Sequence, residues 1–83
     1  MTVGVSVLPK GTRGRRHRHP VDEVYLLYAG KALLSKDDKS IIMSPGMAIF
    51  IPSNTPHALE TLEDTVLVWQ FPVPLHTVEY DFS

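Results

Sequence analysis

Apolar and polar residues alternate over short segments along most of the chain, and turn-forming residues separate these segments. A period of two is typical of β-strands, because successive side chains of a strand point to opposite faces of the sheet. No segment shows a convincing helical period. We expect strands at residues 3–8, 23–29, 31–35, 40–43, 47–51, 57–61 and 65–71. Several short strands at close spacing predict an all-β sandwich or barrel, with residues 1–83 as a single domain.

The burial of individual strands follows from the same pattern. Residues 47–51 are apolar at every position, which predicts a strand buried on both faces. In the segment 65–71, Leu67, Trp69 and Phe71 share one face, and Val66, Val68 and Gln70 share the other. Both faces are compatible with the interior, so the pattern leaves open which of them points inward.

Composition excludes several classes of protein. The formal net charge is −1, so no global field favours nucleic acid as a partner. The chain has no cysteine, which excludes both a disulfide framework and a thiolate metal ligand. No apolar run approaches the length of a membrane span, and the first residues lack the features of a signal peptide. We therefore expect a cytoplasmic protein that binds neither nucleic acid nor membranes.

Metal-ligating residues occur at regular spacing on the expected strands. His17 and His19 are two residues apart, which places both side chains on one face of a strand, and Glu23 follows at another even offset. His57 comes from a distant segment, so only tertiary folding completes the site. Three imidazoles and one carboxylate form a donor set suited to one divalent transition metal ion, such as Fe, Mn, Ni, Cu or Zn.

The same residues resemble the two motifs of the cupin superfamily. The first motif is matched at every specified position, by Gly11, His17, His19, Glu23 and Gly30. The second is matched by Gly46, Pro52 and His57. Asn54 stands where the family has Gly, a mild departure because Asn tolerates left-handed backbone, and Thr61 stands where the family has Asn. The resemblance implies a small antiparallel β-barrel, the jelly-roll-like double-stranded β-helix, with the metal inside.

The resemblance also implies classes of function. Many relatives with these four ligands are dioxygenases, and others are isomerases, epimerases or lyases. We expect a mononuclear metal-dependent enzyme acting on a small oxygenated compound, with oxidative cleavage by dioxygen as the favoured reaction. The alternatives are a non-catalytic cupin that binds a small molecule, and a metal-dependent isomerase or lyase. No catalytic residue is identified beyond the ligands, and Tyr25, or Tyr28 if the register shifts by one, is the nearby candidate for acid–base chemistry.

Strand parity suggests the lining of a substrate pocket. Tyr25 and Leu27 share the parity of Glu23, and Leu59 shares that of His57. Arg15 has the parity of the two motif histidines and could pair with an anionic substrate through its planar guanidinium. Trp69 joins this set, although a Trp at such a position is more often a core residue.

The ends of the chain suggest self-association. Terminal strands of so short a barrel would leave unpaired edges, so we expect a homodimer or higher oligomer in which a partner covers these edges or receives the strand 3–8. In the C-terminal tail, Val78, Tyr80 and Phe82 alternate with polar residues and are expected to pack on the barrel or on a partner. His76 lies outside every motif and is expected in solvent.

Overall fold

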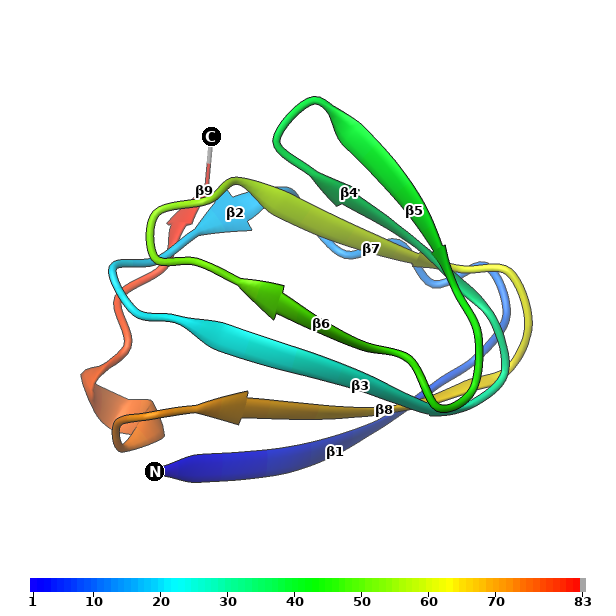
Figure 1. Cartoon of the computed structure of the whole chain (residues 1–83), viewed down its shortest axis with the longest axis horizontal. Coiled ribbons are helices and arrows are strands. Elements are labelled where there is room, and N and C mark those ends of the chain that lie inside the picture. The colour runs from blue at the N-terminus through cyan, green and yellow to red at the C-terminus, as the bar shows by residue number, and fades with distance from the viewer. Residues whose placement is uncertain (83) are drawn as a thin grey trace.

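The computed structural model describes residues 1–82, and this part of the chain is almost entirely β-structure (Figure 1). The elements in chain order are β1 (Thr2–Leu8), β2 (His17–Arg18), β3 (Glu23–Ala29), β4 (Ala32–Lys36), β5 (Lys39–Met43), β6 (Ala48–Ile51), β7 (His57–Thr61), β8 (Thr65–Phe71), the 3₁₀ helix η1 (Leu75–Thr77) and β9 (Asp81–Phe82). Among these residues no helix is long and apolar enough to cross a membrane.

The strands form two antiparallel sheets that face each other (Figure 1). The four-stranded sheet has the order β1-β8-β3-β6, and the five-stranded sheet has the order β5-β4-β7-β2-β9. Strands that are neighbours in space are mostly distant in sequence, as β1 beside β8 illustrates. The prediction of a small all-β, jelly-roll-like fold is confirmed.

The expected strands agree with the observed ones to within about one residue. Three features differ. Strand β6, expected to be buried on both faces, exposes Ala48 and Phe50 on its outer side, because among residues 1–82 no strand packs over that side of the sheet. The strand that carries His17 is only two residues long and ends at Arg18, so His19 lies outside it, next to Pro20, which has no amide hydrogen for the ladder. The tail contains a short 3₁₀ helix and the two-residue β9, which pairs with β2.

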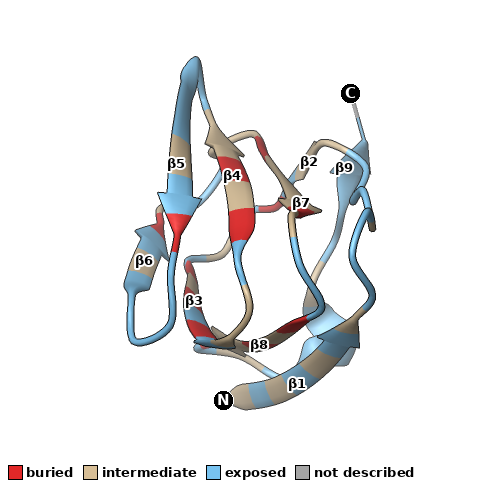
Figure 2. Ribbon diagram, turned by 90° about the vertical axis from the view of Figure 1, so that its right-hand side faces the viewer, coloured by how far each residue is buried: buried red, intermediate tan, exposed pale blue. Residues whose placement is uncertain are grey.

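The core lies between the sheets. Leu27, Leu34, Met43 and Ile51 are fully buried there, and Figure 2 shows buried positions in red on strands of both sheets. On β8 the inward face is that of Leu67, Trp69 and Phe71, which the sequence pattern left open. Burial of each large aliphatic side chain contributes about 1.5–3 kcal/mol relative to exposure, so these residues hold the two sheets together.

Strand β1 carries its apolar residues on the outside. Gly4 and Ser6 point inward, and Val3, Val5 and Val7 point to solvent. Gly4 lies opposite Trp69, and a Cβ atom at this position would come within 2.0 Å of the indole ring. The indole Nε1–H donates a hydrogen bond of 2.9 Å to Ser6 Oγ. The small inward residues of β1 therefore make room for Trp69 and fix the face that the strand presents to the core.

Replacing Gly4 by alanine is expected to destabilise the fold, because the new methyl group would displace the Trp69 ring. Overpacking of this kind lowers the free energy of unfolding by about 1–3 kcal/mol. In a domain of this size each kcal/mol lowers Tm by roughly 4–8 °C, which thermal unfolding followed by circular dichroism measures. Gly14→Ala is the matched control, since a Cβ atom at Gly14 meets nothing closer than the Leu59 carbonyl oxygen at 3.4 Å. Equal Tm values for the two variants would contradict this account of β1.

Candidate metal centre

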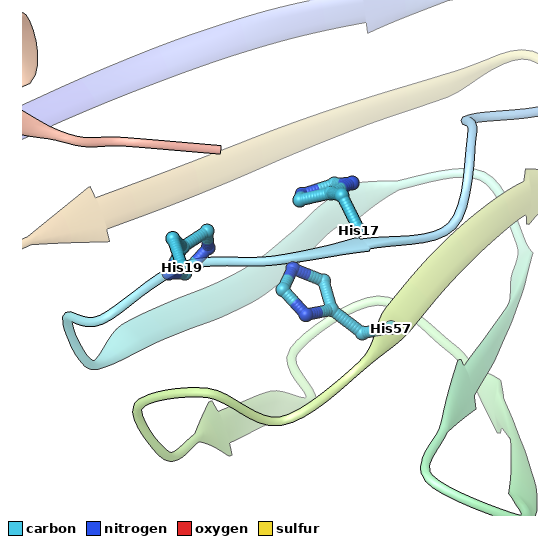
Figure 3. Close-up of side chains that lie close together, drawn as sticks. All are labelled: His17, His19 and His57. Carbon is cyan, nitrogen blue, oxygen red and sulfur yellow. The ribbon is translucent and has the colours of Figure 1, made fainter. Parts of the chain in front are cut away.

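Three histidines meet at one end of the space between the sheets. His17 lies on β2, His19 just beyond the end of β2, and His57 at the start of β7. His17 and His57 are directly opposite each other in the β2–β7 pair. One ring nitrogen from each histidine lies within 4.8 Å of the other two, and Figure 3 shows the three side chains converging. The chain fold thus brings the distant His57 to the pair that parity had already placed on one face.

Each imidazole is held in one orientation by the backbone. The Nδ1 atoms of His17, His19 and His57 lie 2.8, 2.9 and 2.8 Å from the carbonyl oxygens of Arg15, Val21 and Thr55. A carbonyl oxygen only accepts hydrogen bonds, so each Nδ1 carries the hydrogen and donates it. When a ring is neutral, its Nε2 lone pair is then free. Metal-ligating histidines use this arrangement, in which one ring nitrogen donates to a carbonyl oxygen and the other can bind the metal.

Glu23 completes the cluster from the first residue of β3. Its side chain is almost fully buried, and its Oε1 atom lies 3.1 Å from His19 Nε2 and 3.3 Å from His57 Nε2. The His57 contact lacks hydrogen-bond geometry, so His57 Nε2 is buried without a partner. Facing lone pairs of a carboxylate and neutral imidazoles repel each other unless a cation lies between them. The donor atoms present therefore fit a divalent metal ion.

The second motif supports this cluster through its loop. Asn54 has φ of 60°, which confirms that it adopts the left-handed backbone for which the family uses Gly. The Asn54 amide donates a hydrogen bond of 2.7 Å to the carbonyl oxygen of His19. Thr61, at the other departure from the family pattern, is buried and donates a hydrogen bond of 2.6 Å to the Pro9 carbonyl oxygen. Asn54 thus holds His19 in place, and Thr61 anchors the loop that leads to β2.

A cavity of about 280 Å³ opens beside the cluster. It is lined by Ser6, Leu8, His17, Glu23, Tyr25, Leu59, Leu67, Trp69, Phe71 and Tyr80. Of the residues expected in the pocket, Tyr25, Leu59 and Trp69 are in this lining. Leu27 has the expected inward parity but is fully buried in the core and does not line the cavity.

Arg15 is also outside the lining. Its guanidinium lies over the Phe82 ring, 4.7 Å from the ring centroid, and Phe82 in turn packs against His17. Arg15 lies in the loop before β2, where side chains do not alternate as they do in a strand. Its side chain therefore turns toward β9 instead of following the parity of His17. Arg16 and Arg18 contact the Asp37 carbonyl oxygen and the Asp81 carboxylate, respectively, and neither lines the cavity.

The tail contributes a residue that sequence reasoning did not place in the site. Tyr80 lines the cavity, and its ring lies 5.4 Å from that of His17 and 5.6 Å from that of His19, measured between centroids. The alternation of Val78, Tyr80 and Phe82 was the only signal for this position, and it indicated packing rather than a place at the ligands. Pairing of β9 with β2 brings Tyr80 there.

Burial changes the acid–base properties of three side chains at the site. Desolvation lowers the pKa of His17 from 6.5, and the neighbouring His57 and His19 lower it further, against the Arg15 carbonyl. Burial raises the pKa of Tyr25, and the negative charge of Glu23 adds to the effect. Burial and Glu23 also raise the pKa of Tyr80. At neutral pH the site therefore holds a neutral imidazole at His17 and two protonated phenols at the cavity.

Stability of the metal-free protein is expected to fall as the pH drops below 6.5. The unfolded chain takes up a proton on His17 near its ordinary pKa of 6.5, whereas the folded chain resists this proton because its pKa is lowered. The contribution is therefore fully present above pH 6.5 and is lost toward the lowered pKa of the folded state. Thermal unfolding of chelator-treated protein across this pH range measures the effect. His17→Gln should flatten the profile, and an unchanged slope in that variant would contradict the assignment.

A two-sheet jelly roll with three imidazoles and a carboxylate at one end defines a class of small β-proteins whose donor cluster could hold a metal ion. Residues 4–76 match the cupin domain family, and the chain belongs to that family. It is 35% identical over 60 residues to dimethylsulfoniopropionate lyase DddQ of Ruegeria pomeroyi, covering 71% of this chain and 30% of that protein. It is 29% identical over 63 residues to an uncharacterized protein of Methanocaldococcus jannaschii, covering 75% of this chain and 50% of that protein. The chain thus spans half or less of the length of these two relatives.

Solved structures agree with this family. The crystal structure of the lyase DddQ superposes with a TM-score of 0.84 at 26% identity, over 98% of this chain and 42% of that one. Salicylate 1,2-dioxygenase of Pseudoaminobacter salicylatoxidans, in its adduct with gentisate, gives a TM-score of 0.88 at 15% identity, over 98% of this chain and 23% of that one. At that identity the dioxygenase bears on the fold alone.

Proposed function

We propose that the protein is a mononuclear metal-dependent enzyme that acts on a small oxygen-bearing compound. The observation that carries this proposal is the cluster of His17, His19, His57 and Glu23 beside a cavity, in which His57 Nε2 is buried without a partner. In this proposal these four residues hold one divalent transition metal ion, of which Fe, Mn, Ni, Cu and Zn are candidates. A metal bound there would supply Lewis-acid or redox chemistry.

The cavity supports a small substrate. Its volume of about 280 Å³ lies just below the range of roughly 300–1,000 Å³ that is common for ligand sites, so it fits a small molecule. The walls contributed by Leu59, Leu67, Trp69 and Phe71 are largely apolar, as the walls of small-molecule sites usually are. Polar contacts to the substrate would come from the phenols of Tyr25 and Tyr80, which stay protonated and can donate hydrogen bonds to a substrate oxygen.

Oxidative cleavage with dioxygen remains the first candidate reaction, and the donor set supports it because nitrogen and carboxylate ligands suit redox-active metals. A second candidate is a lyase reaction, which eliminates a leaving group from a small acid. The relationship to DddQ favours it, since 35% identity reaches beyond fold alone and that relative is a dimethylsulfoniopropionate lyase. Elimination consumes no dioxygen, so the two candidates make opposite predictions in its absence.

The deciding experiment reconstitutes the metal-free protein with Fe(II), Mn(II), Ni(II), Cu(II) and Zn(II) in turn. Each form is offered catechols, diketones, thiols, hydroxy acids and dimethylsulfoniopropionate, with and without dioxygen. Metal-dependent turnover that requires dioxygen supports the oxidative reaction, and turnover that persists without dioxygen supports the lyase. His19→Ala should abolish either activity. Tight binding of one compound without turnover under any condition would indicate a binding protein and overturn the enzyme proposal.

A further inference from the structure

Ser6 places a hydroxyl group in the cavity at the end away from the metal cluster. It lies on β1 and is paired with Leu67 of β8, which is in turn paired with Leu27 of β3. Glu23 precedes Leu27 by four residues on β3, which separates Glu23 from the row of Ser6 by roughly 13 Å along the strand direction. Ser6 and Glu23 both line the cavity. The cavity therefore has two polar ends, one at the metal cluster and one at Ser6.

The wall between these two ends is aromatic and firmly held. Trp69 lies in the intervening row, paired with Gly4 on β1 and with Tyr25 on β3, and Figure 1 shows the three strands side by side. The close contact with Gly4, the hydrogen bond to Ser6 and the Phe71 ring, 5.8 Å away between centroids, hold the indole in place. A wall that is already ordered binds a flat apolar group at little further cost in entropy.

The Ser6 hydroxyl keeps its own hydrogen available for a bound molecule. A serine hydroxyl has one hydrogen to donate and two lone pairs that accept. One lone pair accepts the hydrogen bond of 2.9 Å from the Trp69 indole N–H, and within residues 1–82 the Ser6 side chain makes no other hydrogen bond. Since hydrogen bonds in a chain polarise one another, the bond from Trp69 makes Ser6 a better donor. Ser6 can thus donate to an oxygen acceptor in the cavity.

The charge of the lining selects the kind of acceptor. The residues that line the cavity include no Lys or Arg, and they include the acidic Glu23. A carboxylate at the Ser6 end would lose water without gaining a cationic partner, which is costly. A carbonyl, hydroxyl or ether oxygen carries no charge and still accepts a hydrogen bond. The Ser6 end of the cavity therefore fits a neutral oxygen.

We propose that Ser6 is a specificity-determining residue that recognises a neutral oxygen acceptor at the end of the substrate farthest from the metal centre. The substrate class is then a small compound with two oxygen-bearing ends and a flat apolar middle, such as an aromatic ring, that packs on Trp69. The identity of the reacting end rests on the proposed function. The Ser6 contact uses no residue of the metal centre, so the two proposals can fail separately.

The test uses two probes of nearly the same shape, 4-hydroxyacetophenone and 4-isopropylphenol. Both carry a phenol for the metal end, but only the ketone has an oxygen acceptor at the other end. Each probe is titrated into chelator-treated and Zn(II)-loaded protein, and binding is followed by ¹⁵N–¹H NMR. Trp69 is the only Trp of the chain, so its indole N–H gives a single signal that reports from the cavity. Both probes should shift this signal in the parent protein.

Ser6→Ala should weaken binding of the ketone by roughly 2–10-fold, the effect of one lost hydrogen bond, and should leave binding of 4-isopropylphenol unchanged. Thr2→Val is the matched control, because Thr2 lies on the same face of β1 and its hydroxyl donates to the Val73 carbonyl oxygen outside the cavity. It should leave both affinities unchanged. If circular dichroism shows Ser6→Ala unfolded, Ser6→Cys replaces it, since a thiol of similar size is only a weak donor.

Equal weakening of both probes in the Ser6 variant would show that Ser6 merely supports Trp69 and would overturn the proposal. Unchanged affinity for the ketone, or a parent protein that binds neither probe, would overturn it as well. Selective loss of the ketone in a protein that turns over no compound with any metal would leave the Ser6 contact standing and remove the proposed enzyme function. Turnover without any selective loss would do the reverse.

Discussion

Replacement of His57 by alanine is expected to empty the metal site. His57 is fully buried, one of its ring nitrogens lies within 4.8 Å of a ring nitrogen of His17 and of His19, and the backbone of Thr55 fixes its ring. Loss of a partner that merely orients a ligand lowers metal affinity about 10–100-fold, and loss of a ligand itself should exceed this. Metal analysis of protein purified without chelator should fall from about one ion per chain for the parent to near zero for His57→Ala.

His76→Ala is the matched control for this variant. His76 lies in the exposed helix η1, far in sequence from both motifs, and contacts neither Glu23 nor the other histidines. It should retain the full metal content of the parent. Unchanged metal content in His57→Ala would disprove the ligand assignment, provided that circular dichroism shows both variants folded.

Replacement of Tyr25 by phenylalanine is expected to lower turnover while leaving the metal bound. Tyr25 lines the cavity beside Glu23, and burial keeps its hydroxyl protonated at neutral pH, so its proposed role is to donate a hydrogen bond or a proton to the substrate. Loss of a positioned acid–base group typically lowers kcat by about 10²–10⁴-fold. The measurement compares kcat of the parent and of Tyr25→Phe on the compound that the substrate panel identifies, at equal metal content.

Tyr28→Phe provides the control from the same strand. Tyr28 is 71% exposed on the outer side of β3, so removal of its hydroxyl should leave kcat unchanged. Equal activity of Tyr25→Phe and the parent would remove Tyr25 from the mechanism. A matching fall of metal content and kcat in Tyr25→Phe would show that the residue supports the metal site rather than the substrate.

Local sequence patterns were sufficient for the strands and for most of the cluster formed by the three histidines and Glu23. The period of two is a property of the strand backbone itself, so parity places His17 and His19 together and turns Glu23, Tyr25 and Leu27 to one face. Turn chemistry is equally local, and the left-handed conformation of Asn54 could be anticipated from its side chain. These features need no knowledge of which strands become neighbours.

Other features depend on how distant segments pack, and only the tertiary structure decided them. Parity separates the two faces of β8, but the contact of Trp69 with Gly4 selects the one that points inward. Tyr25 and Leu27 have the same parity on β3, but they lie at different positions between the sheets. Tyr25 lines the cavity, whereas Leu27 is fully buried in the core.

The position of the tail and the composition of the outer surface also depend on how distant segments pack. Tyr80 reaches His17 and His19 only because β9 pairs with β2, and the same pairing places Phe82 beneath the guanidinium of Arg15. The apolar outer side of the four-stranded sheet exists only because four segments from distant parts of the chain align their outward positions. The sequence alone determined the chemistry of single strands, since that depends on neighbours along the chain. The tertiary structure decided the cavity and the outer surface, since these depend on contacts between residues far apart in sequence.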